Sequence, residues 1–291
     1  MKKSIFVLGA AALLLTGCAP TALAPTELKP VAEAIHTTNS SEEFVAPTKG
    51  TLTMTQIFNY KYPGEDPFES NSTGTLKFDA ATGYFAMISV EDGETSEMYS
   101  YAKDGTYYMA VSEGGEKMYA SIPCGTQDVA ITAAITMLEE LGFGSLLTTY
   151  AAGITELETV INFCNQIILN TDDDTENDVN NGYTDSYSVG LTGTASGNNM
   201  DVTVTLSGSA SATDGEYSEF ASVNGTFKAK FENGYLTYSL DEANLVERAT
   251  MEGETLEMTV YSKSETTISY GDVDFTYPDL TNGYTEMEIP M

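Results

Sequence analysis

The 291-residue chain has one histidine, no tryptophan and three cysteines, and this scarcity excludes several kinds of chemistry. The only histidine, His36, lies in a segment rich in Ala, Pro, Thr and Ser, so a Ser-His-Asp or Cys-His arrangement inside a folded domain is excluded. The sequence contains no His/Cys spacing typical of a metal site. We therefore expect that the protein is not an enzyme. Asp and Glu are abundant enough for a hydrolase that uses two carboxylates, but the sequence indicates no particular pair.

Basic residues are also scarce, with 12 Lys and Arg against 43 Asp and Glu and a formal net charge of −31. Neither Lys nor Arg occurs between Lys117 and Lys228. This balance excludes nucleic acid, which needs a basic footprint, and disfavours flat contact with anionic lipid head groups. It favours a solvated surface, with an acidic docking face for a basic protein partner as the alternative. The 18 Tyr and 12 Phe indicate a folded domain rather than an acidic tail.

The N-terminal apolar run is too short to span a bilayer, which needs about 20 residues. It follows Lys2 and Lys3 and ends at Leu15-Thr-Gly-Cys18, the order of an export signal. The last four residues resemble the lipobox of bacterial lipoproteins. This resemblance implies that residues 1–17 are a signal peptide and that Cys18 carries diacylglycerol with palmitate-type chains. We expect an extracytoplasmic protein anchored to the cell membrane, or to the outer membrane in a Gram-negative cell.

Residues 18–50 read as the lipidated cysteine followed by a tether, and residues 51–291 as a single β-rich domain. Short runs of alternating polar and apolar residues follow from Thr51, separated by pairs such as Asp92-Gly93, Asp104-Gly105 and Gly114-Gly115. Such pairs are typical of antiparallel hairpins. Longer strands resume after residue 183, and their apolar positions, such as Leu236, Tyr238 and Leu240, alternate cleanly.

Between residues 126 and 170 the apolar spacing lengthens to three and four residues, which predicts a helical block. Its Cys164 and the preceding Cys124 can form a disulfide outside the cytoplasm, or both can remain buried free thiols.

An acidic loop follows the predicted helical block. Asp174, Glu176 and Asp178 occupy alternate positions, as the first ligands of a calcium loop do. Val179 stands where such a loop needs Gly, and no Glu closes it. The segment is a weak calcium candidate, and the alternative is a solvated loop. No other cofactor is expected.

The order of anchor, tether, about six strands, helical block and about five longer strands resembles the LolA/LppX-type superfamily of lipoproteins. The paired hairpin segments from Tyr99 to Met109 and from Glu116 to Ile122, and a last strand-like segment from Ile268 to Pro278, carry the resemblance. It implies an α+β fold: a curved antiparallel half-barrel of about 11 strands, its open face covered by the helices of residues 126–170. Tyr119 departs from the family by standing where a Trp is common.

The resemblance also implies a cavity between sheet and helices that binds a lipid or another apolar small molecule. Met is frequent on the strands and suits a pliable apolar surface. The candidate lining residues are Met54, Phe78, Phe85, Met87, Ile131, Ile135, Leu138, Val202, Val204, Phe227, Leu236 and Met258. The alternative is a filled β-core without a ligand, in a surface lipoprotein that serves a structural or protein-interaction role.

Overall fold

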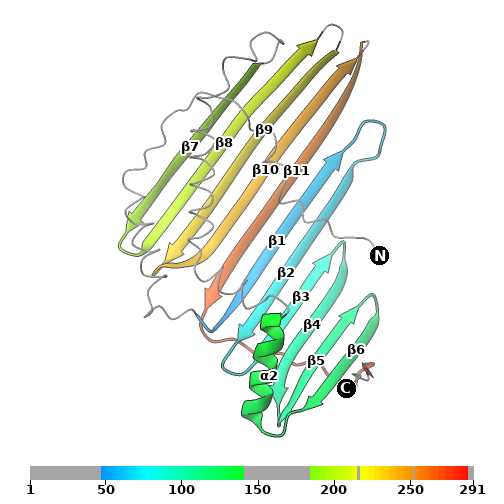
Figure 1. Cartoon of the computed structure of the whole chain (residues 1–291), viewed down its shortest axis with the longest axis vertical. Coiled ribbons are helices and arrows are strands. Elements are labelled where there is room, and N and C mark those ends of the chain that lie inside the picture. The colour runs from blue at the N-terminus through cyan, green and yellow to red at the C-terminus, as the bar shows by residue number, and fades with distance from the viewer. Residues whose placement is uncertain (1–46, 141–183, 215–216, 252, 288–291) are drawn as a thin grey trace.

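The computed structural model describes residues 47–140, 184–214, 217–251 and 253–287, and these form one sheet of twelve strands. The strand order is β12-β6-β5-β4-β3-β2-β1-β11-β10-β9-β8-β7. Figure 1 shows long strands at one end of the sheet and short ones at the other. The strands are β1 (Lys49–Lys61), β2 (Phe68–Asp79), β3 (Tyr84–Glu91), β4 (Glu94–Lys103), β5 (Thr106–Glu113), β6 (Glu116–Pro123), β7 (Thr184–Ser196), β8 (Asn199–Asp214), β9 (Tyr217–Glu232), β10 (Tyr235–Met251), β11 (Glu254–Tyr270) and β12 (Thr285–Glu286).

Tight two-residue turns connect several neighbouring strands. Asp92 and Gly93 between β3 and β4 have φ angles of 50° and 85°, and Asp104 and Gly105 between β4 and β5 have 52° and 73°. Positive φ at both central residues is the type I′ geometry that matches the twist of a hairpin. The hairpins predicted at these sequence pairs are therefore confirmed.

The pairing of β1 with β11 joins two meanders that are far apart in the sequence. Gly50 lies opposite Tyr270, and the antiparallel ladder continues to Lys61 opposite Thr259. On its other edge β1 pairs with β2. The sheet is therefore continuous from the short strands β3–β6 to the long strands β7–β11 (Figure 1).

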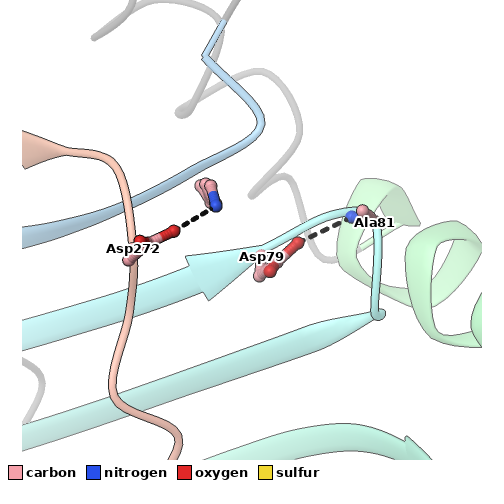
Figure 2. Close-up of polar contacts among 4 residues, drawn as sticks. Asp79, Ala81 and Asp272 are labelled. Carbon is pink, nitrogen blue, oxygen red and sulfur yellow. Dashed lines mark hydrogen bonds and ion pairs between the residues drawn. The ribbon is translucent and has the colours of Figure 1, made fainter.

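One helix, α2 (Gln127–Glu140), lies among the described residues and packs against β4 and β5. It also contacts the β2–β3 turn, where Gly83 has φ +66° and a Cβ there would lie 2.8 Å from the Cβ of Ala134. The Asp79 carboxylate accepts a 2.9 Å hydrogen bond from the Ala81 backbone N–H and fixes the same turn (Figure 2). Glycine at position 83 thus allows the helix to approach the sheet closely.

The C-terminal segment, residues 271–284, crosses the other face of the sheet, behind the strands in Figure 1. The Tyr84 hydroxyl donates to the backbone oxygen of Thr276 at 2.9 Å and accepts from its N–H at 3.0 Å. Phe275 and Tyr277 lie edge-on to the Tyr84 ring, with centroids 4.7 and 5.7 Å away. The segment is therefore fixed by an aromatic cluster, and β12 ends it by pairing in parallel with β6.

An ion pair fixes the start of this crossing segment. The ammonium of Lys49 donates to the Asp272 carboxylate at 2.5 Å (Figure 2). The hydrogen bond lowers the pKa of Asp272 and raises the pKa of Lys49. Both side chains remain solvent-exposed, so this pair contributes less to stability than the buried contacts of Tyr84.

The predicted fold class is wrong. The described residues form one mostly β, twelve-stranded sheet with a single short helix, rather than a half-barrel of about 11 strands closed by a substantial helical block. Of the predicted block, Gln127–Glu140 is helical and residues 141–170 lie outside the described residues. The predicted last strand-like segment, Ile268–Pro278, is a strand only as far as Tyr270, where β11 ends. Beyond it, Phe275 and Tyr277 pack on the Tyr84 ring instead of pairing with a neighbouring strand.

A β-bulge in β10 corrects the predicted alternation of the long strands. Leu236 pairs with Phe231, but Tyr238 pairs with Lys230, so one extra residue, Thr237, enters β10. Side chains alternate with period two, so one inserted residue reverses the face of every later side chain. Tyr238 and Leu240 therefore lie on the face opposite Leu236. No helix in the part of the chain described is long and apolar enough to cross a membrane.

Candidate functional site: the apolar face

All nine strand residues predicted to line a cavity lie on one face of the sheet, here called the apolar face. The pairings Phe78–Phe85 and Val204–Phe227, together with strict alternation along each strand, place them there. The nine are Met54, Phe78, Phe85, Met87, Val202, Val204, Phe227, Leu236 and Met258. These nine positions therefore share a face, and whether they line a cavity stays a prediction.

The three helical candidates are placed differently. Ile131 and Ile135 lie in α2 and are half-buried. Leu138 belongs to the same helix, but its side chain lies outside the described residues. Among residues 127–136 of α2, whose side chains the structure describes, Ala130 and Ala134 are fully buried. Their small side chains allow close approach to the sheet.

The centre of the apolar face is tightly packed. Val202, Phe231 and Leu236 are each 1% exposed, and Phe85 is fully buried. Met54, Met87, Met98 and Phe227 pack around this cluster and are partly exposed. These methionine and phenylalanine side chains therefore surround a filled core with flexible apolar surface, of the kind that can adapt to varied apolar ligands.

Beyond the core the same face continues to the far ends of the long strands and becomes exposed, and there Glu247, opposite Met258, and Glu254, opposite Met251, lie among its apolar residues. Leu256 on β11 and Met251 on β10 are 57% and 63% exposed. On β1 and β2 an aromatic group extends the same face, with the rings of Tyr60 and Phe68 stacked at 4.9 Å and that of Phe58 at 5.8 Å from Tyr60. An exposed apolar surface of this kind marks interaction sites in soluble domains. Met258 lies in this exposed margin, away from the other candidates.

A polar patch divides the core from the exposed margin. Asp241 lies on the apolar face between Phe227 and Ser264, and the latter lies opposite Gln56. The Asp241 side chain keeps an exposed surface, yet the surrounding protein removes enough water to raise the pKa of the carboxyl. Sequence reasoning missed Asp241 because regular alternation from Leu236 assigns it to the opposite face. The bulge at Thr237 has no distinct sequence signal.

The remaining predicted sites are mostly untested. Cys18, His36, Cys164 and the calcium candidates Asp174, Glu176 and Asp178 lie outside the described residues. Cys124 lies at the start of the loop to α2, and its thiol donates to the backbone oxygen of Ile122 at 3.3 Å. Within the described ranges no cluster of His, Cys, Asp and Glu suits a metal ion. The disulfide and the calcium site stay predictions.

Comparisons with known proteins give little further support. No family model matches the chain, and no curated protein matches it. A LolA superfamily protein from Nitrosomonas europaea is 9% identical, with 84% of this chain and 94% of that chain covered and a TM-score of 0.20. The attachment invasion locus protein of Yersinia pestis, solved with a heparin analogue, is 4% identical, with coverage of 77% and 100% and a TM-score of 0.10. Neither likeness carries an argument about fold or ligands, and the resemblance to the LolA/LppX type stays an expectation from the sequence.

Proposed function

We propose that the protein is a non-catalytic, extracytoplasmic lipoprotein, anchored by lipid on Cys18, that binds a lipid or another apolar ligand on its apolar face. The observation that carries the proposal is the continuation of this face from a buried core into an exposed apolar margin. Burying apolar surface contributes about 25 cal/mol per Å². An acyl chain laid along the margin would gain this energy without disturbing the packed core.

The polar patch at Asp241 supports an amphiphilic rather than a purely apolar ligand. The carboxyl, the neighbouring Ser264 hydroxyl and the Gln56 amide offer hydrogen-bonding groups beside the apolar margin. Burial raises the pKa of this carboxyl, and its oxygens can accept hydrogen bonds from a hydroxyl of a lipid head group. A lipid with its head at the patch and its chains on Met258 and Leu256 fits this arrangement.

Uptake of a fluorescent fatty acid by the full-length protein tests ligand binding. Leu256→Asp places a charge on the exposed margin, and Thr255→Asp places the same charge on the neighbouring residue of the opposite face. Both positions are exposed, so both variants should fold. We expect Leu256→Asp to abolish uptake and Thr255→Asp to retain it. Absence of uptake by the parent protein, or equal loss in both variants, would refute ligand binding on this face.

The anchor is tested separately by mass spectrometry of the mature N-terminal peptide. We expect the peptide to begin at Cys18 and to carry the mass of diacylglycerol with fatty-acyl chains. The Cys18→Ala variant should lose this mass and leave the membrane fraction. A mature peptide that starts elsewhere, or an unmodified Cys18, would contradict the proposed anchor while leaving ligand binding untouched.

The second candidate is a structural or protein-interaction lipoprotein with a filled core and no ligand. It is favoured by the complete burial of Phe85 and the near-complete burial of Phe231 and Leu236 at the centre of the apolar face. In that case the exposed margin would bind a protein, and the net charge of −31 favours a basic one. Native mass spectrometry of the detergent-extracted protein separates the two candidates, because only the first predicts co-purifying lipid.

A further inference from the structure

The sheet face opposite the apolar face is covered by the C-terminal segment near β3–β6. On the long strands the same face carries two hollows. A hollow of about 560 Å³ is bounded by residues from β7, β8, β9, β10 and β11. A smaller one of about 230 Å³ lies across β1, β2, β10 and β11. Asn244 and Tyr261 line both, so the two hollows adjoin. Together they are here called the polar groove.

A row of polar side chains runs across the strands along this groove. Asn224 lies opposite Asn244, Asn244 opposite Tyr261, Tyr261 opposite Asn59, and Asn59 opposite Glu69. Adjacent strands are about 4.8 Å apart, so hydrogen-bonding groups recur at that interval over five strands. A periodic row of this kind suits an elongated ligand that lies perpendicular to the strands.

The hydrogen-bonding capacity in the groove is only partly used. The Tyr261 hydroxyl donates to one Glu242 oxygen at 2.9 Å, which holds both side chains in place. The Asn59 side-chain oxygen is buried and has no hydrogen-bond partner among the described residues. A buried acceptor without a partner costs about 1–3 kcal/mol. A ligand that donates a hydrogen bond there would recover that cost.

A missing side chain keeps the larger hollow open. A Cβ at Gly190 on β7 would lie 2.6 Å from the Thr205 hydroxyl oxygen, a contact that real Cβ atoms do not make. Any larger residue would therefore either fill the hollow or displace Thr205. Gly190 thus leaves the hydroxyl of Thr205 accessible from the groove.

We propose that the polar groove binds a neutral saccharide chain. Asn amides and Thr hydroxyls both donate and accept hydrogen bonds, as sugar hydroxyls do. The ring of Tyr261, which lines both hollows, offers apolar surface to the C–H face of a sugar. The charged side chains around the groove are Glu242, Glu69 and Lys61, an acidic balance that disfavours anionic saccharides. The inference does not depend on ligand binding at the opposite, apolar face.

Isothermal titration of the full-length protein with cellohexaose, maltohexaose and the hexamer of N-acetylglucosamine tests the proposal, with an oligogalacturonate as the anionic comparison. We expect saturable binding of at least one neutral chain and none of the oligogalacturonate. Asn244→Ala should weaken binding about fivefold to tenfold, since one net hydrogen bond contributes about 1 kcal/mol. Asn71→Ala, the same change on the same face outside the groove, should leave affinity unchanged.

The outcomes separate cleanly. Absence of saturable binding of all three neutral chains at about 10 mM, a concentration that reveals even millimolar affinity, overturns the proposal. So does equal loss of binding in Asn244→Ala and Asn71→Ala, or preferential binding of the anionic chain. If Asn244→Ala melts at a lower temperature than the parent protein, Thr226→Val is used in place of Asn244→Ala. Thr226→Val removes a groove hydroxyl with little change of side-chain shape. Retention of saccharide binding by Leu256→Asp would show that the two faces bind independently.

Discussion

Tyr84→Phe should release the C-terminal segment from the sheet without disturbing the aromatic cluster. The Tyr84 side chain is 1% exposed, and its hydroxyl makes two hydrogen bonds with the Thr276 backbone, one to the oxygen and one from the N–H. Phenylalanine retains the ring that contacts Phe275 and Tyr277. The substitution therefore removes only the hydroxyl and leaves two backbone groups without their partner.

The expected loss follows from the two hydrogen bonds. Each contributes about 1 kcal/mol net, so the free energy of unfolding should fall by about 2 kcal/mol. For a domain of this size, that corresponds to a decrease in Tm of roughly 4–8 °C. Urea unfolding followed by circular dichroism measures the first quantity, and calorimetry measures the second. Limited proteolysis should also cleave the variant sooner between residues 271 and 284.

Tyr62→Phe is the matched control. The Tyr62 side chain is exposed, and its hydroxyl makes no hydrogen bond with any described residue. This variant should unfold within about 0.5 kcal/mol of the parent protein, the usual range for a surface change. Should Tyr84→Phe lose no more stability than Tyr62→Phe, or should its C-terminal segment resist proteases as well as the parent's, the hydroxyl does not hold the segment in place.

Three further predictions concern the packing of the sheet. Gly83→Ala should destabilise the protein by more than Gly93→Ala in urea unfolding. Both glycines have positive φ, which costs alanine about 1 kcal/mol, but only position 83 also collides with α2. Phe231→Ala should cost about 3–5 kcal/mol of unfolding free energy because the side chain is buried in the core. Burial raises the pKa of Tyr99 and Tyr101 to about 12, whereas unfolded tyrosine ionises near pH 10. The folded state thus binds more protons above pH 10, so the contribution of these two tyrosines to stability should be constant below pH 10 and fall as the pH rises to 12. The tyrosinate absorbance that develops near pH 12 should decrease in Tyr101→Phe.

Local turn chemistry predicted a large part of the sheet. Asp92-Gly93 and Asp104-Gly105 adopt the positive φ angles that their sequence favours, so the hairpins they connect follow from four residues alone. The alternation of Val202 and Val204 likewise predicted which face of β8 is buried. These features are local, and they survive because tertiary contacts reinforce them.

The fold class could not be predicted because it depends on contacts between distant segments. Val273, Phe275 and Tyr277 alternate as a strand does, yet the ring of Tyr84, almost 200 residues earlier, holds this segment across a face instead of at an edge. The long apolar spacing after residue 126 indicates a helix over Gln127–Glu140, but the helical cover on the sheet was inferred from a family resemblance. Periodicity shows that a face is apolar without showing what covers it.

The bulge at Thr237 links the two candidate sites. With regular alternation from Leu236, the side chains of Glu242 and Asn244 would lie on the apolar face and Asp241 on the polar one. The inserted residue reverses these positions, so Asp241 lies on the apolar face, and Glu242 and Asn244 lie on the polar one. It places a carboxyl of raised pKa beside the apolar margin and completes the row of amides in the polar groove. One extra backbone residue in β10 thus gives both faces the polar groups that the two proposed ligands require.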